Sequence, residues 1–93
     1  MTFQEFTATL NHSAPPSLSP LLQAMWYDAK GEWEAAHNIA QDINSNDGSW
    51  VHGYLHRKEG DESNAAYWYR RANKTFKRNT LEEEWIEIVR ALL

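Results

Sequence analysis

Two histidines and a glutamate lie at helical spacing in the middle of the chain. His52 and His56 are four residues apart, and Glu59 follows three residues later. Because an α-helix turns by about 100° per residue, all three side chains project from one side of a helix. Two imidazoles and a carboxylate can bind zinc or another divalent ion, with His37 or Asp42 as a further ligand if the fold brings either one close. His52, His56 and Glu59 are therefore a candidate metal site.

The sequence lacks the motifs of common classes of enzyme. A zinc-protease motif needs Glu directly after its first histidine, and Gly53 stands there instead. No serine, histidine and carboxylate arrangement indicates an activated nucleophile, and the four glycines are too scattered for a phosphate-binding loop. The carboxylates that we expect on solvated helix faces, rather than in acid–base catalysis, are Asp28, Glu32, Glu34 and Asp42. We therefore expect a protein that is not an enzyme and has no cofactor, with a divalent metal such as zinc as the alternative.

Composition and charge exclude several classes of protein. The chain has 93 residues, enough for one domain with one core. It has no cysteine, which removes disulfides and thiolate metal ligands together. No apolar run approaches the ~20 residues that span a bilayer, and no basic start followed by an apolar stretch indicates a secretory signal. With a net charge of -4, we expect a cytoplasmic protein that binds neither nucleic acid nor membrane.

The basic residues are unevenly distributed along the chain. Five of the nine lie within nine positions, namely Arg70, Arg71, Lys74, Lys77 and Arg78. A cluster of this kind stabilises the C-terminus of a helix, whose free carbonyl groups attract cations. An anion site or a nucleic-acid site is the alternative interpretation.

An internal repeat defines the elements that position these side chains. The stretch 21–29 carries an apolar stripe at helical spacing and is followed by Gly31, and 29 residues later the stretch 50–58 repeats the pattern before Gly60. An acidic residue follows each glycine and can open a second helix. The second helices have apolar faces formed by Trp33, Ala36, Ile39, Ala40 and Ile43 and by Ala65, Trp68, Tyr69, Ala72 and Phe76. A period of helix, glycine and helix is typical of stacked helical hairpins.

The repeat and its flanks predict a single all-α domain with two stacked antiparallel helical hairpins, a short N-terminal segment and a C-terminal capping helix. Thr2 and Glu5 form a capping-box pattern that indicates a short first helix. We expect the glutamates of the last helix, Glu82 to Glu84, to face water, and all five tryptophans to lie on inner faces. The predicted parts are 1–19 (N-terminal segment and loop), 20–45 (hairpin 1), 47–74 (hairpin 2) and 80–93 (capping helix), with a polar connection over 44–48.

Small residues in these hairpins resemble the tetratricopeptide repeat. The matching residues are Gly53, Gly60, Asp61, Ala65, Tyr69 and Ala72 in the second hairpin and Ala24, Tyr27, Gly31 and Ala36 in the first. The resemblance covers residues 20–74, although the period is shorter than the ~34 residues of that family and no proline follows the second helix. The run 50–71 also resembles a group of short, uncharacterised bacterial proteins. The repeat resemblance implies a binding scaffold and implies no reaction.

Two helical registers place the histidines differently. The apolar stripe puts His52 and His56 on the opposite, exposed side of their helix, whereas the tetratricopeptide register turns them toward a neighbouring helix. A hydrogen bond there to Tyr27, an aspartate or a carbonyl group would give them a structural role. His37, which follows Trp33 by one helical turn, is expected to cap the edge of the core.

The favoured function is a small protein-interaction module that binds a peptide or a second copy of itself. Tyrosine and arginine dominate binding hot spots, and the candidate residues are Tyr27, His52, His56, Arg57, Tyr67 and Arg71. A loosely packed N-terminal segment would leave an apolar patch, and two-fold pairing of such patches favours a homodimer. The alternative function is a metal- or small-ligand-binding protein that uses His52, His56 and Glu59.

Overall fold

The computed structural model describes residues 1–76 and 79–93, and every regular element within them is a helix. The elements are α1 (Phe3–Ala8), the 3-10 turn η1 (Thr9–Asn11), α2 (Pro20–Ala29), α3 (Trp33–Ala40), α4 (Asn46–Lys58), α5 (Glu62–Arg71) and α6 (Leu81–Leu92). The predicted all-α class is confirmed. Among the described helices, none is long and apolar enough to cross a membrane.

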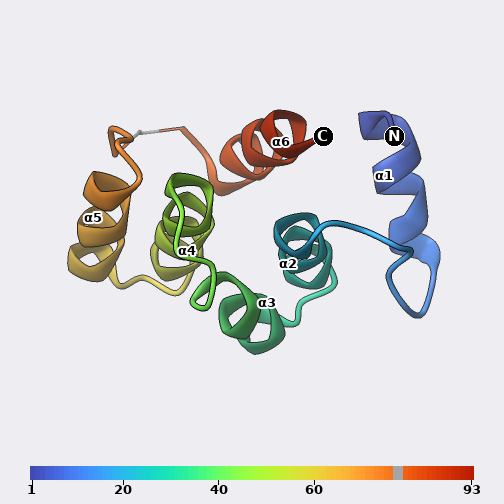
Figure 1. Cartoon of the computed structure of the whole chain (residues 1–93), viewed down its shortest axis with the longest axis horizontal. Coiled ribbons are helices and arrows are strands. Elements are labelled where there is room, and N and C mark those ends of the chain that lie inside the picture. Colours follow the sequence, from blue (N-terminus) through green and yellow to red (C-terminus); the bar gives the residue numbers. More distant parts are fainter. Residues whose placement is uncertain (77–78) are drawn as a thin grey trace.

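The helices pack in pairs that follow one another along an arc. α2 packs against α3, and α4 packs against α5, each pair being joined by a tight turn. α3 also packs against α4, which brings the two pairs together. α6 lies on the other side of α2 and α4 from α3, and α1 stands beside α2 and α6 at the end of the arc (Figure 1). The chain thereby buries α4 among four other helices, α2, α3, α5 and α6.

The turns inside the two pairs share one geometry. Gly31 and Gly60 have φ values of +82° and +92°, the left-handed conformation that glycine adopts without steric cost. After each glycine the backbone returns to the helix, since Glu32 donates to the Tyr27 carbonyl and Asp61 to the His56 carbonyl, both at 2.9 Å. The predicted turns at both glycines are confirmed.

Three predicted helix limits need correction. Ser45 caps α4 by accepting a hydrogen bond from the Gly48 amide at 3.0 Å, so the helix begins inside the stretch predicted as a polar connection. α3 ends at Ala40, which leaves Ile43 beyond it. α5 ends at Arg71, and Asn73 reverses the chain with a φ of 59°, so that Phe76 lies outside the helix and is 37% exposed.

The core forms where α1, α2, α4 and α6 meet. Its largest fully buried side chains are Trp26, Tyr54, Phe6, Met25, Leu55, Ile88, Val51 and Val89. Trp26 and Trp50 are buried as predicted, and the half-buried Trp33 and Trp85 pack against this core. Trp68 is half-buried as well, but its ring stacks on His52. Phe6 is fully buried and its ring lies 6.0 Å from that of Trp85. The N-terminal segment therefore packs on the end of the stack through Phe6, and a homodimer stays a prediction.

Two carboxylates for which the sequence predicts solvent exposure are buried instead. Glu84 is 3% exposed and accepts hydrogen bonds from Tyr69 Oη at 2.6 Å, Arg57 Nη1 at 2.7 Å and Trp50 Nε1 at 3.2 Å. Asp28 is 2% exposed, and its carboxylate also accepts hydrogen bonds from two side chains of α4. These carboxylates join α6 to α4 and α5, and α2 to α4.

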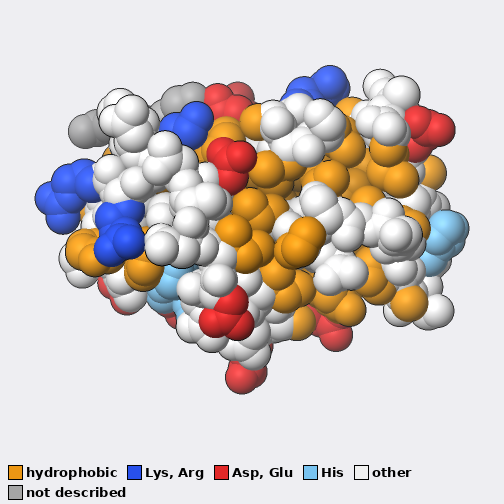
Figure 2. Space-filling view, viewed as in Figure 1, with side chains coloured by type: hydrophobic (Ala, Val, Ile, Leu, Met, Phe, Trp, Pro, Cys, Tyr) orange, Lys and Arg blue, Asp and Glu red, His pale blue; other side chains and the backbone are white. Residues whose placement is uncertain are grey.

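The basic cluster lies mainly around the end of α5. Arg70 and Arg71 occupy the last turn of that helix, as predicted, and Lys74 Nζ lies 4.0 Å from the centre of the Trp50 ring. Lys77 and Arg78 lie outside the described residues. Figure 2 shows basic side chains gathered at the α5 end of the molecule and apolar side chains across the middle of the same face.

Candidate metal-binding site

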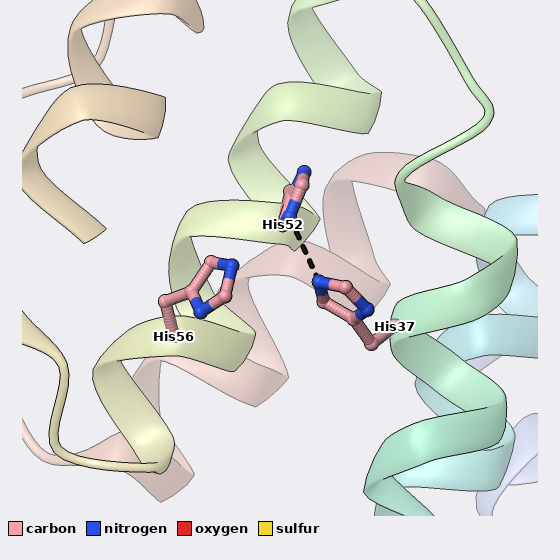
Figure 3. Close-up of side chains that lie close together, drawn as sticks. All are labelled: His37, His52 and His56. Carbon is pink, nitrogen blue, oxygen red and sulfur yellow. Dashed lines mark hydrogen bonds between the residues drawn. The ribbon is translucent and has the colours of Figure 1, made fainter. Parts of the chain in front are cut away.

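Three imidazole rings from two helices converge in the seam between the hairpins. His37 comes from α3, and His52 and His56 come from successive turns of α4 (Figure 3). The Nε2 atoms of His37 and His52 are 3.0 Å apart. One nitrogen from each of the three rings lies within 4.8 Å of the other two. This is the only group of three histidines with such spacing in the described part of the chain.

Two tryptophans hold the rings in place. Trp33 donates its Nε1–H to the Leu55 carbonyl at 2.7 Å, which fixes α3 against α4, and its ring stacks on His37 at 4.8 Å with an interplanar angle of 12°. Trp68 of α5 stacks on His52 at 4.0 Å and 21°. Two of the three imidazoles are therefore each covered by an indole, His37 by Trp33 of its own helix and His52 by Trp68 of α5.

A glycine lets α5 come close enough for this second stack. A Cβ atom at position 53 would lie 3.3 Å from the Ala65 carbonyl oxygen, Trp68 Cβ and the Tyr69 amide nitrogen. Any larger residue would push the two helices apart. Gly53, which the sequence places directly after His52, thus allows the helix contact that seats Trp68 on the His52 ring.

Glu59 determines which nitrogen His56 presents to the cluster. Its Oε2 atom lies 2.6 Å from His56 Nδ1, and the carboxylate is partly open to solvent. A carboxylate at this distance accepts a hydrogen bond from Nδ1–H, which leaves Nε2 as the nitrogen of His56 that is available to a metal. Figure 3 shows the His56 ring turned toward the other two. This arrangement matches the carboxylate–histidine pairs that orient metal ligands in proteins.

Burial lowers the pKa of two histidines of the cluster, His37 and His52. It lowers the pKa of His52 from 6.5 to about 4, with His37 and His56 as additional causes. The pKa of His37 is lowered as well, first by burial and then by His56, while Glu59 acts in the opposite direction. Both rings are neutral at pH 7 and keep a lone pair, which is the form that binds metal.

The spacing of the nitrogens is close to that of a zinc site. Zinc–imidazole bonds of 2.0–2.1 Å in tetrahedral geometry place ligand nitrogens about 3.3 Å apart. The His37–His52 pair, at 3.0 Å, is already near this value. The third nitrogen lies within 4.8 Å of the other two, so it would have to move closer to complete the set. Three protein ligands would leave a fourth position for water or another molecule.

The structure rearranges the predicted metal set of His52, His56 and Glu59. His37, which the sequence offered as a further ligand, joins the two histidines of α4, whereas Glu59 bonds to His56 from outside the three rings. Glu59 also belongs to a second, more exposed group with His56 and Asp61. Asp42 is exposed and is absent from both groups of described residues.

The expected exposure of the α4 histidines is wrong. His52 is 6% exposed and His56 is 8% exposed, because α3 and α5 cover that side of α4. The interpretation in which they lie at a helix contact is correct, but their partners are His37 and Glu59 rather than Tyr27. His37 stacks on Trp33 at the core edge, as predicted.

The six predicted partner-binding residues do not line one groove. His52 and His56 are buried, and Arg57 is committed to Glu84 and to the Asn79 carbonyl. Tyr67 and Arg71 do form an exposed pair on α5, with Arg71 Nη1 donating to Tyr67 Oη at 3.2 Å. Tyr27 is half-buried against Trp26. Peptide binding and self-association therefore stay predictions.

Comparison of the chain with protein-family models, with curated proteins and with solved structures found no match. The resemblance to the tetratricopeptide repeat thus rests on the residues alone. The geometry of the site is the basis on which a function can be inferred.

In the metal-free protein, we expect the free energy of unfolding to decrease as the pH falls from about 6.5 toward 4. His52 has a lowered pKa of about 4 in the folded chain, so the unfolded chain takes up a proton first and acid favours unfolding. Above pH 6.5 the imidazole is neutral in both states, and the effect is absent. Near pH 4 the loss should be roughly 2–3 kcal/mol.

Urea unfolding in the presence of a chelator, measured across this pH range, checks the prediction. His52→Gln should flatten the pH dependence, while His12→Gln, at an exposed histidine outside the cluster, should leave it unchanged. Carboxylates titrate alike in all three proteins, so the comparison isolates the cluster. Equal slopes for the wild type and His52→Gln would contradict the prediction.

Proposed function

We propose that this protein binds one late first-row transition metal ion, with Zn²⁺ as the best match, through His37, His52 and His56. The observation that carries the proposal is the convergence of three imidazoles from α3 and α4, with one nitrogen of each ring within 4.8 Å of the other two. Three histidines with an open fourth position are a common protein environment for zinc. Glu59 supports the set by orienting His56.

The cluster is costly as a purely structural feature, which favours a ligand. Each imidazole that the fold keeps neutral below its ordinary pKa lowers stability in acid, and apolar side chains of similar volume would pack in the seam without that cost. Groups with strongly shifted pKa values that gather in one place are typical of functional sites. A bound metal would replace the hydrogen bond between His37 Nε2 and His52 Nε2 with two metal–nitrogen bonds, and each of these rings would then carry its proton on Nδ1.

The ligand set also favours some metals over others. Imidazole nitrogen binds Zn²⁺, Cu²⁺ and Ni²⁺, whereas Mg²⁺ and Ca²⁺ require oxygen ligands, of which the three rings offer none. The closest carboxylate, Glu59, already accepts a hydrogen bond from His56. Calorimetric titration of tag-free protein should therefore show one Zn²⁺ bound per chain and no heat with Mg²⁺. Zinc binding that survives removal of both α4 histidines would refute the proposal.

Glu59→Gln should weaken zinc binding by about 10- to 100-fold without removing a ligand, because the amide no longer holds the proton on His56 Nδ1 as a carboxylate does. The matched control is Glu62→Gln, an exposed glutamate of α5 that belongs to neither group of possible ligands. Competition with a zinc-sensitive dye gives both affinities. If the two variants have the same affinity, Glu59 does not orient the site.

A further inference from the structure

A cavity separate from the histidine site opens where α2, α4, α6 and η1 come together. It has a volume of about 340 Å³ and is lined by Leu10, Asp28, Ala29, Tyr54, Lys58, Leu81, Glu82 and Trp85. Tyr54 and Lys58 follow His52 and His56 by two positions each, about 200° around α4. The cavity therefore lies on the side of α4 that faces away from the proposed metal site, and a ligand could bind there whether or not the histidines hold a metal.

The cavity has the features of a small-molecule site. Its walls are largely apolar, from Leu10, Ala29, Leu81 and Trp85. Trp85 is fixed in position, since Nε1 donates to the Met25 carbonyl at 3.2 Å and the ring makes an edge contact with Phe3. Small-molecule sites have volumes of about 300–1,000 Å³, apolar walls and a few polar groups.

The charged side chains that line the cavity have a net negative charge. Asp28 is 2% exposed and accepts hydrogen bonds from Tyr54 Oη and Lys58 Nζ, both at 2.9 Å, so that Lys58 compensates the buried carboxylate. Glu82 is exposed at the start of α6, and no cation pairs with it in the described part of the chain. The lining carries one more negative charge than positive charges.

This charge determines the kind of ligand that fits. An anion would have to displace Asp28 from Lys58 while lying near Glu82. A cation would pair with Glu82 and leave the Asp28–Lys58 ion pair intact, and the Trp85 ring offers a further attraction to positive charge. We propose that the cavity binds a small organic cation, a primary amine with an apolar body, whose ammonium group meets Glu82 while the body packs on Leu81 and Trp85.

Three probes of similar size and different charge test this proposal: 2-phenylethylamine, 2-phenylethanol and 3-phenylpropionate. We expect the amine to bind about tenfold more tightly than either of the others, as an ion pair and a cation–π contact together provide. Two-dimensional NMR of the whole chain locates the binding, since the amine should shift the signals of Ala29, Leu81 and the Trp85 indole.

Glu82→Gln should remove the preference for the amine, and Glu62→Gln on α5 should keep it. Because both glutamates are exposed, we expect both variants to fold. An NMR spectrum that matches that of the wild type away from the substituted residue will verify this. Equal affinity for all three probes, tighter binding of the propionate, shifts confined to another surface or no binding at all would each overturn the proposal.

Discussion

Glu84→Ala should lower the free energy of unfolding by about 3–5 kcal/mol. Glu84 is 3% exposed and accepts hydrogen bonds from three side chains of α4 and α5. Alanine would leave Arg57 as an unpaired, partly buried cation, and the Tyr69 hydroxyl would lose its acceptor. Removing one partner of a buried ion pair costs far more than the pair contributes, because the remaining charge stays desolvated.

Chemical denaturation of Glu84→Ala and of Glu82→Ala measures this effect. Glu82 lies two positions earlier in the same helix turn but is exposed, so its loss should change stability by about 0.5 kcal/mol or less. A double variant, Glu84→Met with Arg57→Met, should recover much of the loss, since it leaves no unpaired charge. A Glu84→Ala protein as stable as Glu82→Ala would show that the Glu84 network does not hold α6 in place.

His37→Ala should weaken zinc binding by about 100-fold or more. It removes one of three proposed ligands, and loss of even an outer partner of a metal ligand costs about 10- to 100-fold. The variant also tests whether the first hairpin contributes to the site, since His37 is the only one of the three histidines that comes from α3. Because His37 is only half-buried, the variant should still fold.

His12→Ala is the matched control, because it removes an exposed histidine outside the cluster. Calorimetry should give wild-type affinity for this variant. Circular dichroism of both variants without metal verifies that their helix content is unchanged. If His37→Ala retains wild-type affinity, zinc is held by α4 alone or by the exposed carboxylates, and the three-histidine site is wrong.

The turns inside the two helix pairs follow from local signals in the sequence. Gly31 and Gly60 end helices by taking up a conformation that few other residues adopt, and the 29-residue period relates the two turns. The capping box of Thr2 and Glu5 is likewise present in the structure. Such signals act over a few residues and can be read without knowledge of the tertiary fold.

The buried carboxylates have a signal in the sequence that the prediction of solvated glutamates and aspartates overlooked. Glu84 follows Leu81 by three positions and precedes Ile88 by four, which places it on the apolar face of α6. Asp28 follows Met25 by three positions and lies on the apolar face of α2 in the same way. Acidic residues are usually solvated, and applying that rule gave the wrong prediction for Glu84 and Asp28, although the helical pattern places both on apolar faces.

The partnership of His37 with the α4 histidines could not be predicted from periodicity. The pattern of α4 shows that His52 and His56 share a side, but the angle at which α3 crosses α4 depends on side-chain packing between hairpins. Trp33 fixes that crossing through a hydrogen bond to the Leu55 carbonyl, a contact between residues 22 positions apart. Long-range contacts of this kind leave no mark in a single sequence.

Anomalous diffraction at the zinc edge, from crystals of tag-free protein grown with Zn²⁺, would show directly whether the three histidines hold a metal. We expect one strong peak per chain between His37, His52 and His56, with an imidazole nitrogen of each ring about 2.0–2.1 Å from the metal. Glu59 should remain bonded to His56 Nδ1 outside the coordination sphere. A peak only at the exposed carboxylates of Glu59 and Asp61, or no peak near the three rings, would contradict the three-histidine site.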